Sequence, residues 1–191
     1  AGAAHRALAR LADALRPMNA ASRLTRPVKL AAGLLLAALL YWWAVTPGQR
    51  QALPRAEAPE ISLPDVNGRM ATLSSFRGKV VLLDFWATWC EPCLEELPDL
   101  IRLHEARKNE GFTMVGVAMD ADGAAVVGSF VRQNKIPYPI LLSNGEPPAG
   151  YPIPGFPTAF LIDRDGRILR RYLGPKGYEE IERDLAEALG R

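Results

Sequence analysis

Cys90 and Cys93 are the two cysteines of a chain of 191 residues, and they are separated by two residues. Two thiols at this spacing can form and break a disulfide with each other. The thiolate is the nucleophile in such exchange reactions. A secreted protein stapled by disulfides would need more cysteines. The spacing therefore predicts thiol–disulfide redox chemistry.

The local setting of the pair favours this interpretation. The apolar run 80–85 predicts a buried strand before it, and the pattern from Cys93 to about Lys108 predicts a helix after it. Free N–H groups and the macrodipole favour negative charge at a helix N-terminus. We therefore expect Cys90 to be the acidic, accessible thiol that attacks. Cys93, one turn inward, is expected to be the buried thiol that resolves the mixed disulfide.

The two residues between the cysteines affect the same chemistry. Pro92 is expected to stiffen the loop. Glu91 places a negative charge beside Cys90 and should oppose formation of its thiolate. This charge favours a reducing protein over a strong oxidant.

A metal site and an inert structural disulfide are the alternatives to thiol–disulfide exchange. A metal site needs about four ligands, and His5 and His104 are the two histidines of the chain. An inert structural disulfide would constrain little, because the loop it closes is so small. We therefore predict redox exchange, with no metal and no cofactor.

The elements that must position the cysteines follow from periodicity. Asn67-Gly68 between two short apolar segments predicts a β-hairpin. Continuous apolar runs predict buried central strands, and apolar residues at helical spacing predict three helices. The order predicts an α/β fold in which a mixed sheet is flanked by helices. The predicted strands are 61–63, 70–73, 80–85, 112–118, 139–142, 158–162 and 168–172, and the helices are 93–108, 122–134 and 178–189.

The N-terminal part of the chain predicts a membrane anchor. Residues 1–29 form a basic tail with a net charge of +5, and residues 30–46 carry no charge. An excess of Lys and Arg before an apolar span places the N-terminus in the cytoplasm. We expect a single transmembrane helix at 30–46, a linker at 47–60 and a folded domain at 61–191. A cleaved signal peptide and a buried core helix are the alternatives for the apolar run.

The charge of the remaining chain excludes one class of partner. After residue 46 there are 17 basic and 20 acidic residues, a net charge of −3. The basic balance of the whole chain therefore belongs to the tail. A mildly acidic domain argues against a nucleic-acid partner.

The segment Val81–Cys93, VLLDFWATWCEPC, resembles the active-site segment of thioredoxins. More narrowly, it is similar to that of the membrane-anchored, extracytoplasmic reductases of the TlpA, ResA and CcmG type. Residues 155–163, GFPTAFLID, are similar to their second signature. The resemblance covers roughly residues 58–189 and implies a thioredoxin-like fold with an N-terminal β-hairpin and a central insertion. The hairpin and the segment 119–142 resemble the wider redoxin group.

The resemblance also implies roles for residues around the cysteines. Pro157 would follow a cis peptide bond and pack opposite Cys90. Asp84 would be a buried proton acceptor for the resolving thiol, and Glu96 an acid that tunes the thiol pair. Trp89 is expected to shield the site. Burial of either acid would raise its pKa.

The function implied is that of an extracytoplasmic thiol–disulfide oxidoreductase on the periplasmic side of the inner membrane. Its substrates would be disulfides in exported proteins, such as apocytochrome c or oxidase assembly factors. An inner-membrane electron donor would reduce it again. The alternatives are a thiol peroxidase of the redoxin group and a non-catalytic assembly chaperone.

Overall fold

The computed structural model describes residue 36 and residues 56–190. The expected basic tail, the expected transmembrane helix apart from residue 36, and most of the expected linker lie outside these residues. Within the described part of the chain, no helix combines the length and the apolar character needed to cross a membrane.

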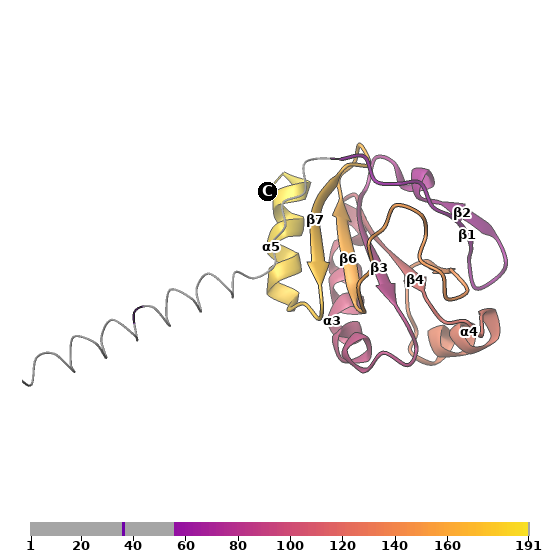
Figure 1. Ribbon diagram of the computed structural model, residues 1–191. Coiled ribbons are helices and arrows are strands. Elements are labelled where there is room, and N and C mark those ends of the chain that lie inside the picture. The colour runs from indigo at the N-terminus through magenta and orange to yellow at the C-terminus, as the bar shows by residue number, and fades with distance from the viewer. Residues whose placement is uncertain (1–35, 37–55, 191) are drawn as a thin grey trace, which may run out of the picture. The chain divides into compact units, whose positions relative to one another are not determined.

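A five-stranded mixed sheet forms the centre of the domain, in the order β5-β4-β3-β6-β7 (Figure 1). The central strand β3 (Val80–Trp86) pairs in parallel with β4 (Phe112–Ala118). On its other side β3 pairs antiparallel with β6 (Thr158–Ile162). The edge strand β5 (Ile140–Leu142) runs parallel to β4, and β7 (Ile168–Leu173) runs antiparallel to β6. The sheet agrees with the prediction of a mixed sheet in an α/β fold.

Every residue of β3 is buried, because both faces of the sheet are covered. Alternate residues of a strand point to opposite faces. Val80, Leu82 and Trp86 accordingly belong to one core cluster, while Val81, Leu83 and Phe85 belong to a second. The first cluster also contains both cysteines.

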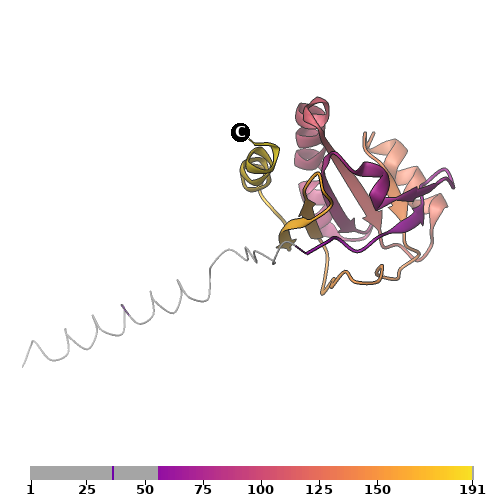
Figure 2. The ribbon, with the colours of Figure 1, turned by 90° about the horizontal axis from the view of Figure 1, so that it is seen from above.

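Three helices cover the face that holds the cysteines (Figure 2). They are α3 (Glu91–Arg107), α4 (Ala124–Gln133) and α5 (Tyr178–Leu189). A short 3₁₀ turn, η2 (Lys108–Glu110), follows α3. The hydroxyl of Tyr172 in β7 donates a hydrogen bond of 2.9 Å to Asp184 and fastens α5 to the sheet.

The opposite face is covered by a hairpin, a 3₁₀ turn and a long loop. The strands β1 (Ser62–Pro64) and β2 (Met70–Thr72) pair antiparallel, and η1 (Leu73–Phe76) follows them. Tyr151, from the loop between β5 and β6, packs on Phe85 with ring centroids 5.3 Å apart.

Residues 57–60, expected from the sequence to belong to the linker, are part of the folded domain. Glu57 bridges to Arg167, and Ala58 is buried. The amide of Ala58 donates to the carbonyl of Gly166, and the carbonyl of Ala56 accepts from the amide of Ile168. Backbone hydrogen bonds therefore begin five residues before the expected domain boundary.

Candidate active site

The two cysteines form a disulfide, with Cα atoms 5.3 Å apart, at the start of α3. Cys90 is the N-cap residue, and its sulfur accepts a hydrogen bond of 3.3 Å from the amide of Cys93. Pro92 occupies the first turn, where the missing N–H of proline costs no helical hydrogen bond. Glu91, also in the first turn, is exposed. A helix N-terminus of this kind stabilises negative charge on the sulfur that caps it.

The two cysteine residues differ less in exposed fraction than the sequence suggested. Cys90 is 5% exposed and Cys93 is 4% exposed. The expectation that Cys90 is clearly more accessible is therefore wrong for this disulfide-bonded form. Both cysteines of the disulfide belong to the first core cluster.

Trp89 does not shield the pair by burial, because its side chain is 67% exposed. Its ring meets that of Phe156 edge to face, with centroids 5.7 Å apart. Trp86, by contrast, is buried and packs on Phe130 of α4. Trp89, the residue before Cys90, therefore forms an aromatic pair with the half-buried Phe156, the residue before Pro157.

A buried aspartate holds the loop that leads into the cysteines. The carboxylate of Asp120, just after β4, accepts hydrogen bonds from the amide of Thr88 at 3.1 and 3.2 Å and from its hydroxyl. The amide of Cys90 donates to the carbonyl of Ala87. Asp120 could not be predicted from the sequence, because an aspartate after a strand has the same pattern as an ordinary loop residue.

The loop before β6 brings Pro157 to the same end of the sheet. The Phe156–Pro157 peptide bond is cis, as the resemblance implied. Thr158, the next residue, lies opposite Phe85 in the antiparallel register of β3 and β6. The carbonyl of Pro157 accepts from the amide of Gly174, which fixes the loop to the end of β7.

Asp84 and Glu96 lie in one buried charged cluster, together with a lysine that the sequence analysis did not identify. The ammonium of Lys176 is 3.4 Å from Glu96 Oε1 and 3.9 Å from Asp84 Oδ1. The amide of Lys176 also donates to Glu96 Oε2 at 3.0 Å. All three side chains are at most 7% exposed.

Burial governs the ionisation of this cluster. Loss of solvent raises the pKa of Glu96 to about 7, although Lys176 acts to lower it and Asp84 adds to the rise. Burial also raises the pKa of Asp84, with Lys176 opposing the shift. The pKa of the nearby buried Tyr138 is raised by burial and by both carboxylates. A carboxyl group with a pKa near neutral pH can exchange protons with a thiol.

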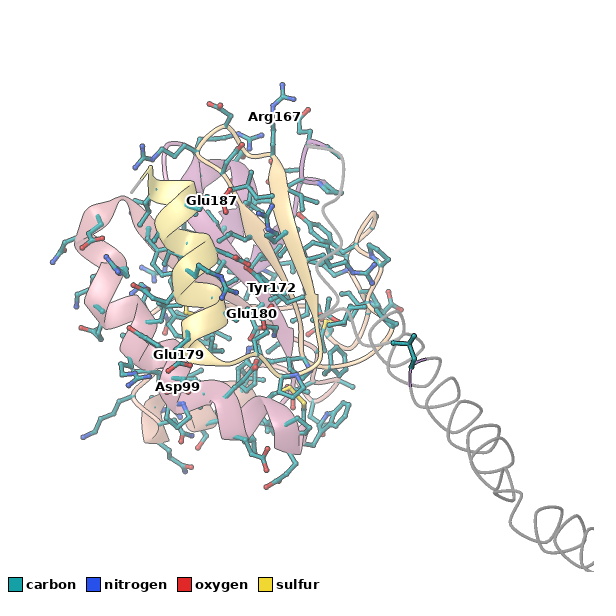
Figure 3. All side chains as sticks on the ribbon, turned by 90° about the vertical axis from the view of Figure 1, so that its left-hand side faces the viewer. Asp99, Arg167, Tyr172, Glu179, Glu180 and Glu187 are labelled. Atoms are coloured by element: carbon teal, nitrogen blue, oxygen red, sulfur yellow. A yellow bond between two sulfur atoms is a disulfide. The ribbon has the colours of Figure 1, made fainter. Side chains whose placement is uncertain are left out.

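Figure 3 shows the labelled Glu179 at the start of α5, the end of the sheet to which β7 also leads. The loop between β7 and α5 carries Lys176 to this end, and the first turns of α3 carry Glu96 there. The site therefore combines a disulfide at a helix N-terminus, a cis-proline loop and buried carboxyl groups that can take up or release protons. Such a fold and site define a thioredoxin-like thiol–disulfide oxidoreductase.

The Redoxin family profile matches residues 54–189, and the chain belongs to this family. It is 35% identical to the thiol-disulfide oxidoreductase ResA of Bacillus anthracis over 128 residues, which cover 66% of the chain and 73% of the relative. It is 31% identical to ResA of Bacillus subtilis (strain 168) over 144 residues, covering 74% of the chain and 80% of the relative.

Solved structures show the same likeness. A Chlorobium tepidum protein, crystallised as a candidate thiol:disulfide interchange protein DsbE, is 34% identical with a TM-score of 0.68. The match covers 73% of this chain and 100% of that one. The class defined by the site and the names of these relatives agree.

Proposed function

We propose that the chain is a membrane-anchored, extracytoplasmic reductase of disulfides in exported proteins. Cys90 attacks the substrate disulfide, and Cys93 resolves the mixed disulfide. An electron donor in the inner membrane then reduces the pair again. Apocytochrome c and oxidase assembly factors are the proposed substrates, in line with the resemblance to the anchored reductases.

The observation that supports reduction over oxidation is the negative charge around the cysteines. Glu91 follows Cys90 directly and lies exposed in the first turn of α3. Negative charge disfavours a thiolate. A strong oxidase requires an unusually stable thiolate in its reduced form. The charge of Glu91 therefore favours a reducing pair.

Anchoring is supported by the sequence alone. The apolar run 30–45 follows a basic tail with a net charge of +5. That charge asymmetry would leave the domain on the outer side of the membrane.

The experiment is to trap substrates in cells that carry the full chain. The Cys93→Ala variant can form a mixed disulfide through Cys90 but cannot release it. We expect adducts with exported, cysteine-containing proteins, which reductant dissolves and mass spectrometry identifies. The matched control, Cys90→Ala with Cys93→Ala, should form none.

Two results would contradict the proposal. Adducts made only with cytoplasmic proteins, or none at all, would exclude exported substrates. A reduction potential above about −150 mV would contradict the direction of electron flow, because it lies on the oxidising side of protein disulfide isomerase.

A further inference from the structure

The cluster of Asp84, Glu96 and Lys176 holds two acids and one base in a place without solvent. The structure gives their side chains exposed fractions of 7%, 4% and 3%. With every group charged, the cluster carries a net charge of −1, and an uncompensated buried charge is costly. With one carboxyl group protonated, the cluster is neutral. The positive charge of Lys176 therefore favours the state in which the two carboxyl groups hold one proton between them.

The contacts distinguish the two carboxyl groups. Both oxygens of Glu96 accept hydrogen bonds from Lys176, one from its amide and one from its ammonium. Asp84 Oδ1 lies 3.9 Å from the ammonium and has no hydrogen-bond partner among the described residues. Hydrogen bonds to a carboxylate favour its ionised form. Glu96 is thus the better anion, and Asp84 is the better site for the proton.

The cluster is placed to act on Cys93. Glu96 is three residues after Cys93 in α3, and residues at this spacing share a helix face. Asp84 alternates with Leu82 and Trp86 on the face of β3 whose core cluster contains both cysteines. The charged group and the sulfur therefore belong to the same layer between the sheet and the helices.

We propose that Lys176 is a positioning residue for thiol–disulfide exchange: its ammonium keeps one of the two buried carboxyl groups ionised, so that the cluster offers one base and one acid to the sulfur of Cys93. This deepens the proposed function and rests on exchange at the cysteines. It does not depend on which protein is the substrate.

The Cys90 thiolate attacks a disulfide, forms a mixed disulfide and expels the first thiolate of the substrate. The ionised carboxylate then takes the proton from the Cys93 thiol. The Cys93 thiolate attacks the Cys90 sulfur, so that the intramolecular disulfide forms and the mixed one breaks. The second substrate thiolate leaves and takes up the proton that the carboxylate had accepted, so that the carboxylate is restored; the substrate gains two electrons and the cysteines lose two.

Among the described residues, the charged groups that act on Asp84 and Glu96 are Lys176 and the two carboxyl groups themselves. In the sheet, Asp84 pairs with Gly116 of β4 and Ala159 of β6, neither of which titrates. Tyr138, before β5, interacts with both carboxyl groups and has its pKa raised by burial. Removal of Lys176 therefore removes the cation that acts on Asp84 and Glu96.

The test follows the resolution step with oxidised glutathione as the probe. The reduced protein forms a mixed disulfide on Cys90, and Cys93 then releases the second glutathione in a first-order step. We measure this rate between about pH 5 and pH 9 for the unaltered chain and for Lys176→Met. Without the cation the accepting carboxyl group ionises less readily. The inflexion of the curve of rate against pH should therefore move up by about one pH unit or more. Lys176→Arg, which keeps the charge, should leave the inflexion near its original place.

An exposed lysine provides the matched control. Lys79 precedes β3 at the end of the sheet remote from the cysteines, and Lys79→Met should not move the inflexion. An unchanged inflexion in a folded Lys176→Met variant would reject the proposal. Loss of exchange with glutathione in the unaltered chain would instead reject the exchange chemistry on which the proposed function stands.

A second pair of variants covers the case in which Lys176→Met does not fold. Glu96→Gln with Lys176→Met removes one charge of each sign and leaves Asp84 as the carboxyl group of the cluster. Its inflexion should lie above that of Glu96→Gln alone, because only the latter keeps the lysine. Equal inflexions in these two variants would overturn the role of Lys176.

Discussion

At the scale of the residue, Glu95 and Glu96 show how position changes the chemistry of one side chain. They are neighbours in α3, but Glu95 is exposed and Glu96 is buried against Lys176. Successive residues of an α-helix point in directions about 100° apart, so the two side chains lie in different environments. Burial raises the pKa of Glu96 to about 7.

This shift makes stability depend on pH. The folded chain binds the proton of Glu96 more tightly than the unfolded chain, whose carboxyl group has a pKa near 4.5. The contribution of Glu96 to the free energy of unfolding should therefore be fully present below that pH and be lost as pH rises toward 7. This contribution is at most about 3 kcal/mol, from the difference between 4.5 and about 7. Asp84, whose pKa is also raised, acts in the same direction.

Denaturant unfolding at pH 5 and pH 8 checks this expectation. Glu96→Gln cannot titrate, so its stability should decline less between the two pH values than that of the unaltered chain. Glu95→Gln is the control and should retain the full decline. An equal decline in stability between pH 5 and pH 8 for the two variants would show that Glu96 does not bind its proton as described.

The residues of the site differ in how far the sequence predicts them. The cysteines could be placed because a buried strand before them and a helical pattern after them are local signals. The roles of Asp84 and Glu96 came from a resemblance. Lys176 could not be found, since it lies 80 residues from Glu96 in a loop of Gly and Pro, where a lysine is normally solvated. Only the folded chain brings its ammonium into the core.

At the scale of the element, the strands were predictable and the start of α4 was not. Continuous apolar runs identified β3 and β4, because strands buried on both faces have no polar alternation. The sequence predicts a helix over 122–134. Instead α4 begins at Ala124 after Gly123, whose φ of 67° suits glycine and whose backbone forms the cap without a side chain.

Two glycines in neighbouring elements should respond oppositely to the same change. A Cβ at Gly116 in β4 would lie 2.5 Å from Ile140 Cδ1 and 2.9 Å from the Trp86 indole nitrogen. Gly116→Ala should therefore destabilise the domain by about 1–3 kcal/mol through overpacking. Gly128, inside α4, has its nearest neighbour at 3.4 Å in the flexible Arg132 side chain. Gly128→Ala should stabilise by about 0.5–1 kcal/mol, because alanine favours a helix.

Thermal and denaturant unfolding of both variants measure these effects. A neutral result for Gly116→Ala would mean that Ile140 and Trp86 move aside without cost. In that event the close approach of β4 to its neighbours would not constrain the sheet.

At the scale of the whole molecule, the order of helices and strands was predictable from the sequence, but the start of the domain was not. The prolines and acidic residues before residue 61 lack a periodic pattern, so the sequence predicts a linker there. In the structure, Ala58 and Ile61 are buried in the second core cluster. Long-range contacts with the turn after β6 recruit this segment, and such contacts leave no local signal.

The residues of both core clusters lie within 58–189. We therefore expect a protein of residues 56–191 to fold without the preceding chain. Its melting temperature and its rate of reaction with oxidised glutathione should equal those of the full chain in detergent. A truncated protein that is unfolded, or that melts at a clearly lower temperature, would show that earlier residues contribute to the core.

The domain receives its preceding chain at the end that lies away from its sulfurs. Ala56 bonds to Ile168, which pairs with Ile162, and Ile162 in turn lies opposite Val81 near the first residue of β3. Cys90 follows the other end of β3, about 20 Å along the strand. A protein substrate that docks at Cys90 therefore approaches the end of the domain opposite Ala56, and its size is not limited by the backbone that Ala56 places beside β7.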